Sequence, residues 1–104
     1  MKQFYAGTFM SKDDLANVGV NYPVKLEYYK TESKFFKEIG ESRYGIEVIK
    51  TSYLNEGIKV ENSKITGIAK DEKIVNKILD IMKKNEVTPV CAEYIVQDLL
   101  KEIV

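Results

Sequence analysis

The few residues that could carry out chemistry lie mostly in the last third of the chain. Cys91 comes shortly after Thr88 and Pro89, and Asp98 and Glu102 stand one helical turn apart further along. At the start of a helix the dipole favours a thiolate, so Cys91 could act as a nucleophile. Two carboxylates one turn apart could bind a cation or transfer a proton.

Both features also have a plainer structural explanation, which we favour. Cys91 falls beside Ile95 on the apolar side of the predicted last helix, and cysteine is among the most often buried residue types. We therefore expect Cys91 to pack in the core. The sequence offers Asp98 and Glu102 no further ligands, so we expect either a solvated face or one acid that pairs with Arg43 or a lysine.

The composition removes several classes of enzyme. The chain has no histidine and one cysteine, so Ser–His and Cys–His pairs cannot form and a usual zinc site cannot be built. No Walker-type loop, dinucleotide-binding glycine pattern or EF-hand spacing occurs. We expect no enzymatic activity, no catalytic residue, no cofactor and no metal.

The charge balance argues against a nucleic-acid or membrane partner. Lys and Arg number 16, and so do Asp and Glu. One predicted helix carries a row of lysines on a single side, namely Lys73, Lys77 and Lys84. Asp80 lies within this row, as is usual on a solvated helix face. Direct nucleic-acid binding is therefore not favoured. One cysteine favours a reducing compartment, and no apolar run resembles a signal peptide or a membrane span, so we expect a cytoplasmic protein.

Period-2 alternation predicts strands in the first two thirds of the chain. The alternation is clear in two segments, PVKLEYYKT (23–31) and RYGIEVIKT (43–51). A third strand, GIKVEN, follows the turn signal at 55–57, and KITGI adds a short fourth strand. QFYAGTF is a weaker candidate. The predicted inward-facing side chains of the two clear strands are Val24, Leu26, Tyr28, Tyr44, Ile46 and Val48. Residues 32–42 fit a long hairpin connection or a frayed helical turn, and residues 11–19 fit a turn or one helical turn capped by Ser11 or Asp13.

From Asp71 the apolar period changes to 3.6 and predicts two helices. The first buries Ile74, Val75, Ile78, Leu79, Ile81 and Met82. Asn85 is expected to end it in the left-handed conformation. Thr88 as N-cap and Pro89 as first helical residue then begin the second helix, since proline disfavours a helical residue before it. The second helix is expected to bury Cys91, Ala92, Ile95, Val96, Leu99, Leu100 and Ile103.

These elements predict one α+β domain spanning residues 1–104, mainly β over 1–68 and two helices over 69–104. An antiparallel sheet of three to four strands carries a C-terminal helical hairpin packed on one face. The outer face would then show Tyr29 and Ile49 among charges such as Arg43 and Glu47, as a modest protein-binding patch does. An ordinary half-exposed antiparallel sheet fits the same pattern equally well.

The chain also resembles a known family. The similarity lies in two segments about twenty-five residues apart, YGIEV (44–48) and IVNKILDIMKKNEVTPVCAEYIVQDLL (74–100). They resemble small uncharacterised proteins of clostridia and related Firmicutes, which are grouped as a domain of unknown function. The resemblance spans roughly residues 22–100. It is carried by Tyr44, Gly45, Ile46, Glu47, Asn85, Val87, Pro89, Val96 and Asp98. It implies no reaction or cofactor, and mobile-element and sporulation proteins of these bacteria make a regulator acting on another protein a natural expectation.

The sequence therefore predicts a non-enzymatic, regulatory protein-binding domain whose partner is another protein, such as one that acts on DNA. The partner would bind either the outer sheet face or surplus apolar surface on the last helix. A homodimer is left open. Two alternatives remain: a DNA-associated accessory factor that modulates a recombinase or transcription factor, and a small enzyme without a recognisable motif.

Overall fold

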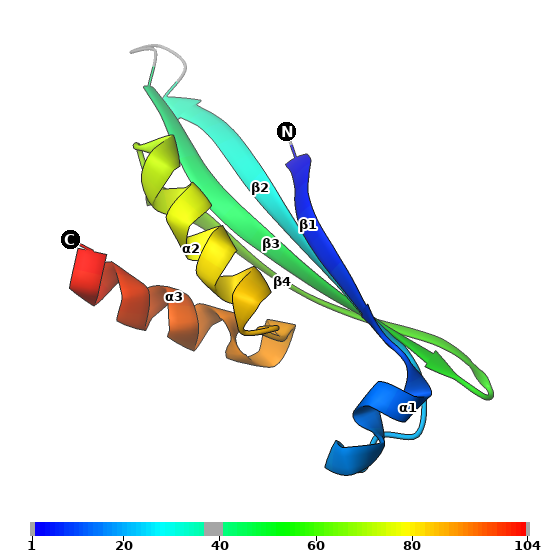
Figure 1. The fold of residues 1–104 in the computed structure, drawn as a ribbon. Helices are drawn as coiled ribbons and strands as arrows, with labels where there is room; N and C mark the ends of the chain where they lie inside the picture. The colour runs from blue at the N-terminus through cyan, green and yellow to red at the C-terminus, as the bar shows by residue number, and fades with distance from the viewer. Residues whose placement is uncertain (1, 37–40, 104) are drawn as a thin grey trace.

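In a computed structural model, which describes residues 2–36 and 41–103, the chain forms an antiparallel sheet with two long helices on one face (Figure 1). In this part of the chain the sheet has four strands in the order β1-β2-β3-β4, each paired with its neighbour in sequence. The strands are β1 (Lys2–Met10), β2 (Val24–Phe36), β3 (Glu41–Leu54) and β4 (Gly57–Ala69). The helices are α1 (Lys12–Leu15), the 3-10 helix η1 (Ala16–Val18), α2 (Glu72–Lys84) and α3 (Pro89–Ile103). The predicted fold class is confirmed.

The core lies between the sheet and α2 and α3, and the alternation in β2 and β3 places it there. Leu26 and Tyr28 of β2 and Ile46 and Val48 of β3 are fully buried. The helix α2 supplies the facing layer. The buried apolar cluster comprises Val24, Leu26, Tyr28, Ile46, Val48, Val75, Ile78, Leu79, Met82, Val87, Ala92 and Val96.

The strands are longer than expected because polar residues continue them. The segments GIKVEN and KITGI are parts of one strand, β4, and the prediction of two strands is wrong. Polar side chains do not interrupt β4, since an edge strand exposes much of its surface to water. Similarly, residues 32–36 and 41–42 are strand, with Ser33 opposite Arg43, so no helical turn occupies them. Residues 37–40 of the predicted connection lie outside the described residues.

The links around the sheet show the expected capping chemistry. Ser11 begins α1 with a capping box: Asp14 N donates to Ser11 Oγ at 3.2 Å and Ser11 N donates to Asp14 Oδ2 at 3.0 Å. Asp71 caps α2 by accepting from Lys73 N at 2.9 Å. Lys30 of β2 pairs with Glu72 in the first turn of α2 and so ties that helix to the sheet.

The joint between α2 and α3 is a Schellman turn. Glu86 N donates to Lys83 O at 3.2 Å, and Val87 N donates to Met82 O at 3.0 Å. The left-handed residue is Glu86, with φ of 50°, whereas Asn85 has φ of −97°. The prediction that Asn85 is the left-handed terminator is therefore wrong by one residue. Asn85 instead donates from Nδ2 to Ile81 O at 2.8 Å.

The second helix begins at Pro89, as predicted. Cys91 N donates to Thr88 O at 3.1 Å, which is the first backbone hydrogen bond of the helix. Buried Val87 precedes this start, and its carbonyl accepts a hydrogen bond from Tyr28 Oη at 2.9 Å. The joint is thus attached directly to the middle of the sheet.

Cys91 is exposed, so the prediction that it packs in the core is wrong. Among the α3 side chains whose burial the structure describes, the buried ones are Pro89, Ala92 and Val96. Cys91 lies about 130° around the helix from the middle of that stripe, because successive residues advance by about 100°. Ile95, only partly buried, marks the edge of the stripe, and Cys91 lies beyond it.

Candidate functional site

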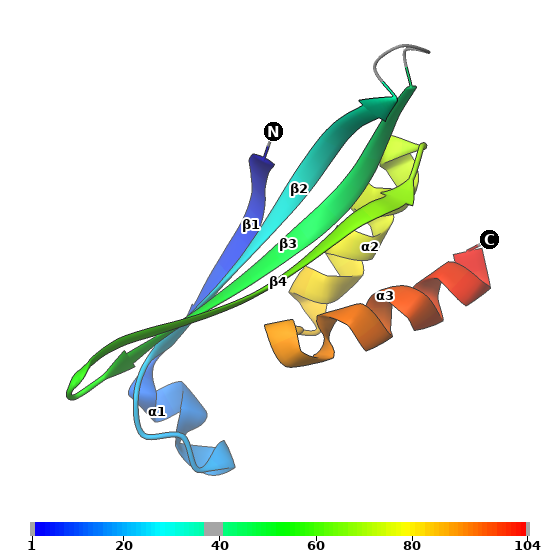
Figure 2. The same cartoon turned by 180° about the vertical axis from the view of Figure 1, so that it is seen from behind.

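The side of the sheet that faces away from α2 and α3, which we call the open face, carries no helix in the described part of the chain (Figure 2). The four predicted site residues all belong to it: Tyr29, Ile49, Arg43 and Glu47. Tyr29 lies opposite Glu47 in the register of β2 and β3, Ile49 lies opposite Glu27, and Arg43 lies opposite Ser33. The structure therefore brings these residues onto one surface, as the alternation predicted.

Glu47 is the least exposed of the four, at 8 %. Its carboxylate forms an ion pair with Lys2 Nζ at 3.3 Å and accepts a hydrogen bond from Asn62 Nδ2 at 3.1 Å. Lys2 comes from β1 and reaches across β2, so its ammonium also lies 4.5 Å from the centre of the Tyr29 ring. A buried carboxylate needs such partners, because an unpaired charge is costly to remove from water. Glu47 therefore ties three strands together on the open face.

Tyr29 connects this group to a second pair of charges. Its hydroxyl donates to Glu27 Oε2 at 2.8 Å, and Glu27 forms an ion pair with Lys25 at 3.6 Å. The hydrogen bond to Glu27, with burial and the charges of Glu27 and Glu47 adding to it, raises the pKa of Tyr29 above its ordinary value. The phenol thus stays protonated as a donor.

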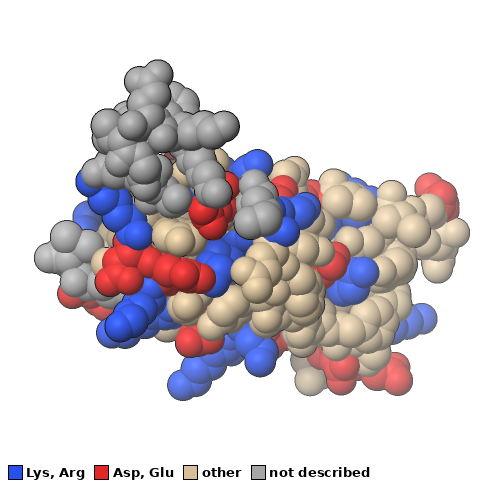
Figure 3. Space-filling view, turned by 90° about the horizontal axis from the view of Figure 1, so that it is seen from above, with Lys and Arg blue, Asp and Glu red and all other residues tan. Residues whose placement is uncertain are grey.

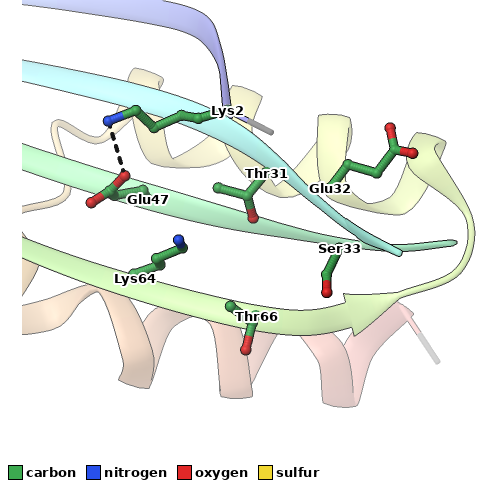
Figure 4. Close-up of a pocket in the computed structure, with 7 residues that line it drawn as sticks. All are labelled: Lys2, Thr31, Glu32, Ser33, Glu47, Lys64 and Thr66. Atoms are coloured by element: carbon green, nitrogen blue, oxygen red, sulfur yellow. Dashed lines mark ion pairs between the residues drawn. The ribbon is translucent and has the colours of Figure 1, made fainter. Parts of the chain in front are cut away.

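A polar hollow of about 660 Å³ lies beside Glu47, toward the ends of β2 and β4 (Figure 4). It is lined by Lys2, Thr31, Glu32, Ser33, Glu47, Lys64 and Thr66. Gly45 lies opposite Thr31, and a Cβ there would come within 2.2 Å of Ile65 O and 2.8 Å of Thr31 Oγ1. Glycine at 45 is therefore required for the close approach of the strands around the hollow. With lysine amines and hydroxyls along its walls, the hollow can hold a polar group by ion pairing and hydrogen bonding.

A second hollow, of about 430 Å³, lies between two aromatic rings of β1. Phe4 and Phe9 are 55 % and 59 % exposed, and Gly7 stands between them. Phe4 packs edge-on against Tyr29 with ring centres 5.6 Å apart, and Phe9 lies 6.3 Å from the ring of Tyr53. We call this group, Phe4, Gly7 and Phe9, the aromatic clamp.

Sequence reasoning missed the aromatic clamp because a bulge hides it. Phe4 and Phe9 are an odd number of positions apart, so strict alternation would place them on opposite faces. The register between β1 and β2 shifts between Phe4 and Ala6, which returns both rings to the open face. The glycine at position 7, inside a strand candidate, was the available signal of a bulge nearby.

The residues considered for chemistry in the last third of the chain do not converge. Cys91, Asp98 and Glu102 are all exposed on α3. Within the described residues neither Asp98 nor Glu102 forms an ion pair, so of the two expectations for them the structure agrees with the solvated face and not with a pairing to Arg43 or a lysine. No group of three Cys, Asp or Glu side chains in the described ranges is arranged to hold a metal ion.

A family model described as a family of unknown function (DUF6514) matches residues 11–102. The chain belongs to this family. No curated protein and no solved structure matches the chain. The matched range contains β2, β3, β4, α2 and all but the last residue of α3, with Gly45 and Glu47, but not β1 with its aromatic clamp. Over the described residues, none of the helices combines the length and apolar character needed to cross a membrane.

Proposed function

We propose that this chain is a non-enzymatic binding domain whose open face holds a protein partner. One observation carries the proposal: two phenylalanine side chains, each more than half exposed, flank a hollow on a sheet face with no helix over it. Apolar side chains that lie together on a surface often mark a site of protein interaction. Aromatic residues are also enriched among the side chains that contribute most to binding at protein interfaces.

The surroundings of the aromatic clamp suit a protein better than a nucleic acid. Lys25 and Glu27 line the same hollow, so opposite charges border the rings. On the side seen from above, basic and acidic side chains of the described residues are interspersed (Figure 3). A polar rim of mixed charge around an apolar centre is the usual composition of a protein interface. The partner then presents an apolar side chain to the space between Phe4 and Phe9.

The test compares two matched pairs of substitutions. Phe4→Ser with Phe9→Ser removes the aromatic clamp, whereas Val90→Ser with Tyr94→Ser removes two exposed apolar side chains of α3, at 74 % and 72 % exposure. Partners are captured by crosslinking in the native host, and the purified pair is measured by calorimetry. We expect the first variant to weaken binding by roughly tenfold or more, since truncating an interface anchor costs about 2 kcal/mol.

Circular dichroism must show that both variants stay folded. The proposal fails if the captured protein binds the Phe4 and Phe9 variant as tightly as the unaltered chain, or if only the α3 variant loses it. It also fails if no specific protein is captured and the pure domain turns over a substrate.

The cellular setting belongs to the same proposal. A reducing cytoplasm agrees with the single cysteine. The resemblance in residues 44–48 and 74–100 supports an origin in clostridia or related Firmicutes, and a regulatory role beside a DNA-acting protein of a mobile element or of sporulation.

A further inference from the structure

The strand β4 is an edge of the sheet. It pairs with β3 on one side, and no other described strand lies along its second side. An edge strand presents unpaired backbone N–H and C=O groups along its free side, which can pair with another strand. The register of β4 against β3 runs without a shift from Gly57 to Ile65, so this part of the edge is regular. The other edge, β1, is interrupted by its bulge after Phe4.

The free part of β4 is also accessible. The tip of the β3–β4 hairpin projects beyond α2 and α3 (Figure 2). Ile58 and Val60 are 66 % and 62 % exposed. A neighbouring strand could therefore reach residues 57–63 without displacing the helices.

The charges on this edge do not form ion pairs with other described residues of the same chain. This holds for Lys59 and Glu61, which point to the helix side of the sheet, and for Glu56 and Lys64 near the two ends of the segment. Charges on an edge strand commonly prevent unwanted pairing with strands of other molecules. In β4 the spacing of the charges also favours one particular register with a second strand.

We propose that β4 pairs antiparallel with β4 of a second copy of this chain, with Val60 opposite Val60 of the second copy. In this register Lys59 lies opposite Glu61 of the second copy, and Glu61 lies opposite Lys59. Glu56, in the turn just before β4, then lies near Lys64 of the second copy. Every charge of the segment thus meets an opposite charge, and the two sheets join into one continuous sheet.

Other registers of the same strands are disfavoured by the same charges. Moving the centre of the pairing to residue 59 places Lys59 against Lys59, and moving it to residue 61 places Glu61 against Glu61. A parallel, in-register pair sets every charge against its own kind. Opposite charges directly across two strands stabilise the pair, and like charges destabilise it. The sequence KVE at 59–61 is therefore self-complementary in one arrangement only.

The experiment uses charge reversal and measures molar mass by sedimentation equilibrium over a range of concentrations. We expect the unaltered chain to approach twice its mass of 11.9 kDa. Lys59→Glu alone and Glu61→Lys alone should each raise the dimer dissociation constant by roughly tenfold or more, because two opposite pairs become like pairs. Lys77→Glu on α2 and Glu93→Lys on α3, both exposed, are the matched controls and should leave it unchanged.

Two combinations make the test specific to the register. The double variant Lys59→Glu with Glu61→Lys should dimerise again, since its pairs are opposite once more. An equimolar mixture of the two single variants should form a heterodimer, because one chain then carries two acids and the other two lysines. Dimerisation restored by neither combination would overturn the proposal, as would a chain that stays monomeric at every concentration.

This inference does not depend on the proposed function. The aromatic clamp lies on β1, at the opposite edge of the sheet. The Phe4 and Phe9 variant should therefore retain the dimer, and the Lys59 variant should retain the protein partner.

Discussion

Tyr28 is the side chain that connects the centre of the sheet to the joint between the helices. The residue is fully buried, and its hydroxyl donates to the carbonyl of Val87 at 2.9 Å. Burial, together with the negative charge of Glu86, raises the pKa of Tyr28 from 10.0 to about 12. The folded protein therefore holds this phenol in its protonated form.

The substitution Tyr28→Phe tests this connection. At pH 7 we expect it to lower the free energy of unfolding by about 1–2 kcal/mol, because the carbonyl of Val87 loses its buried donor. Above pH 10 the unfolded phenol ionises first, while the folded one keeps its proton until about pH 12. The stabilisation from the hydroxyl is therefore complete below pH 10 and declines as the pH rises through this window.

The measurement is urea denaturation of both proteins from pH 7 to pH 11, and the difference between them should shrink at the alkaline end. Tyr94→Phe, at a position 72 % exposed, is the control and should differ little from the unaltered chain throughout. A Tyr28→Phe deficit that is constant across the range would contradict the assignment.

Single residues also mark where sequence reasoning was and was not sufficient. Tyr29 and Glu47 could be placed on one face because β2 and β3 pair without a shift between residues 24 and 33. Phe4 and Phe9 could not, since a bulge is a tertiary feature that alternation does not reveal. Cys91 was misplaced because a helical wheel gives the apolar arc but not which part of it faces the sheet.

At the scale of the element, local chemistry predicted starts better than ends. Asp71 and Pro89 mark the beginnings of α2 and α3 as expected, because capping depends on one or two residues. The end of α2 depends instead on where Val87 is buried. A Schellman turn places its apolar residue after the left-handed position, so the buried Val87 assigns that position to Glu86.

The left-handed Glu86 gives a prediction for the interhelical joint. Glu86→Gly should raise the free energy of unfolding by about 0.5–1 kcal/mol, because glycine avoids the steric cost of positive φ, partly offset by the greater freedom of the unfolded chain. Glu93→Gly, an equal change at an exposed position inside α3, should instead lower it by about 1 kcal/mol. Thermal and urea denaturation can tell a gain in the free energy of unfolding from a loss. If Glu86→Gly lowered it, the Glu86 carboxylate would have to stabilise the fold by more than the backbone strain costs.

At the scale of the whole molecule, the fold is long and unevenly covered. Its principal extents are 50 × 28 × 18 Å. The helices α2 and α3 cover the end of the sheet that holds Ile46 and Val48, whereas the β3–β4 hairpin tip extends past them (Figure 1). Leu54, Ile58 and Val60 near this tip are all exposed. Stability should therefore fall along the sheet toward the tip, because few buried apolar side chains hold that part in place.

Native-state hydrogen exchange can measure this gradient in dilute solution. We expect the amides of residues 53–60 to exchange roughly a hundredfold faster than those of residues 46–48, since the tip can open without breaking the core. Fast exchange in this segment would not simply reflect a missing hydrogen bond, because Tyr53 N donates to Pro23 O at 3.0 Å. In a rigid sheet this amide would be protected. Uniform protection along β3 would mean that the hairpin opens only when the whole sheet does. Protection of residues 57–63 that rises with protein concentration would instead locate self-pairing on β4, and the Lys59→Glu variant should abolish that rise.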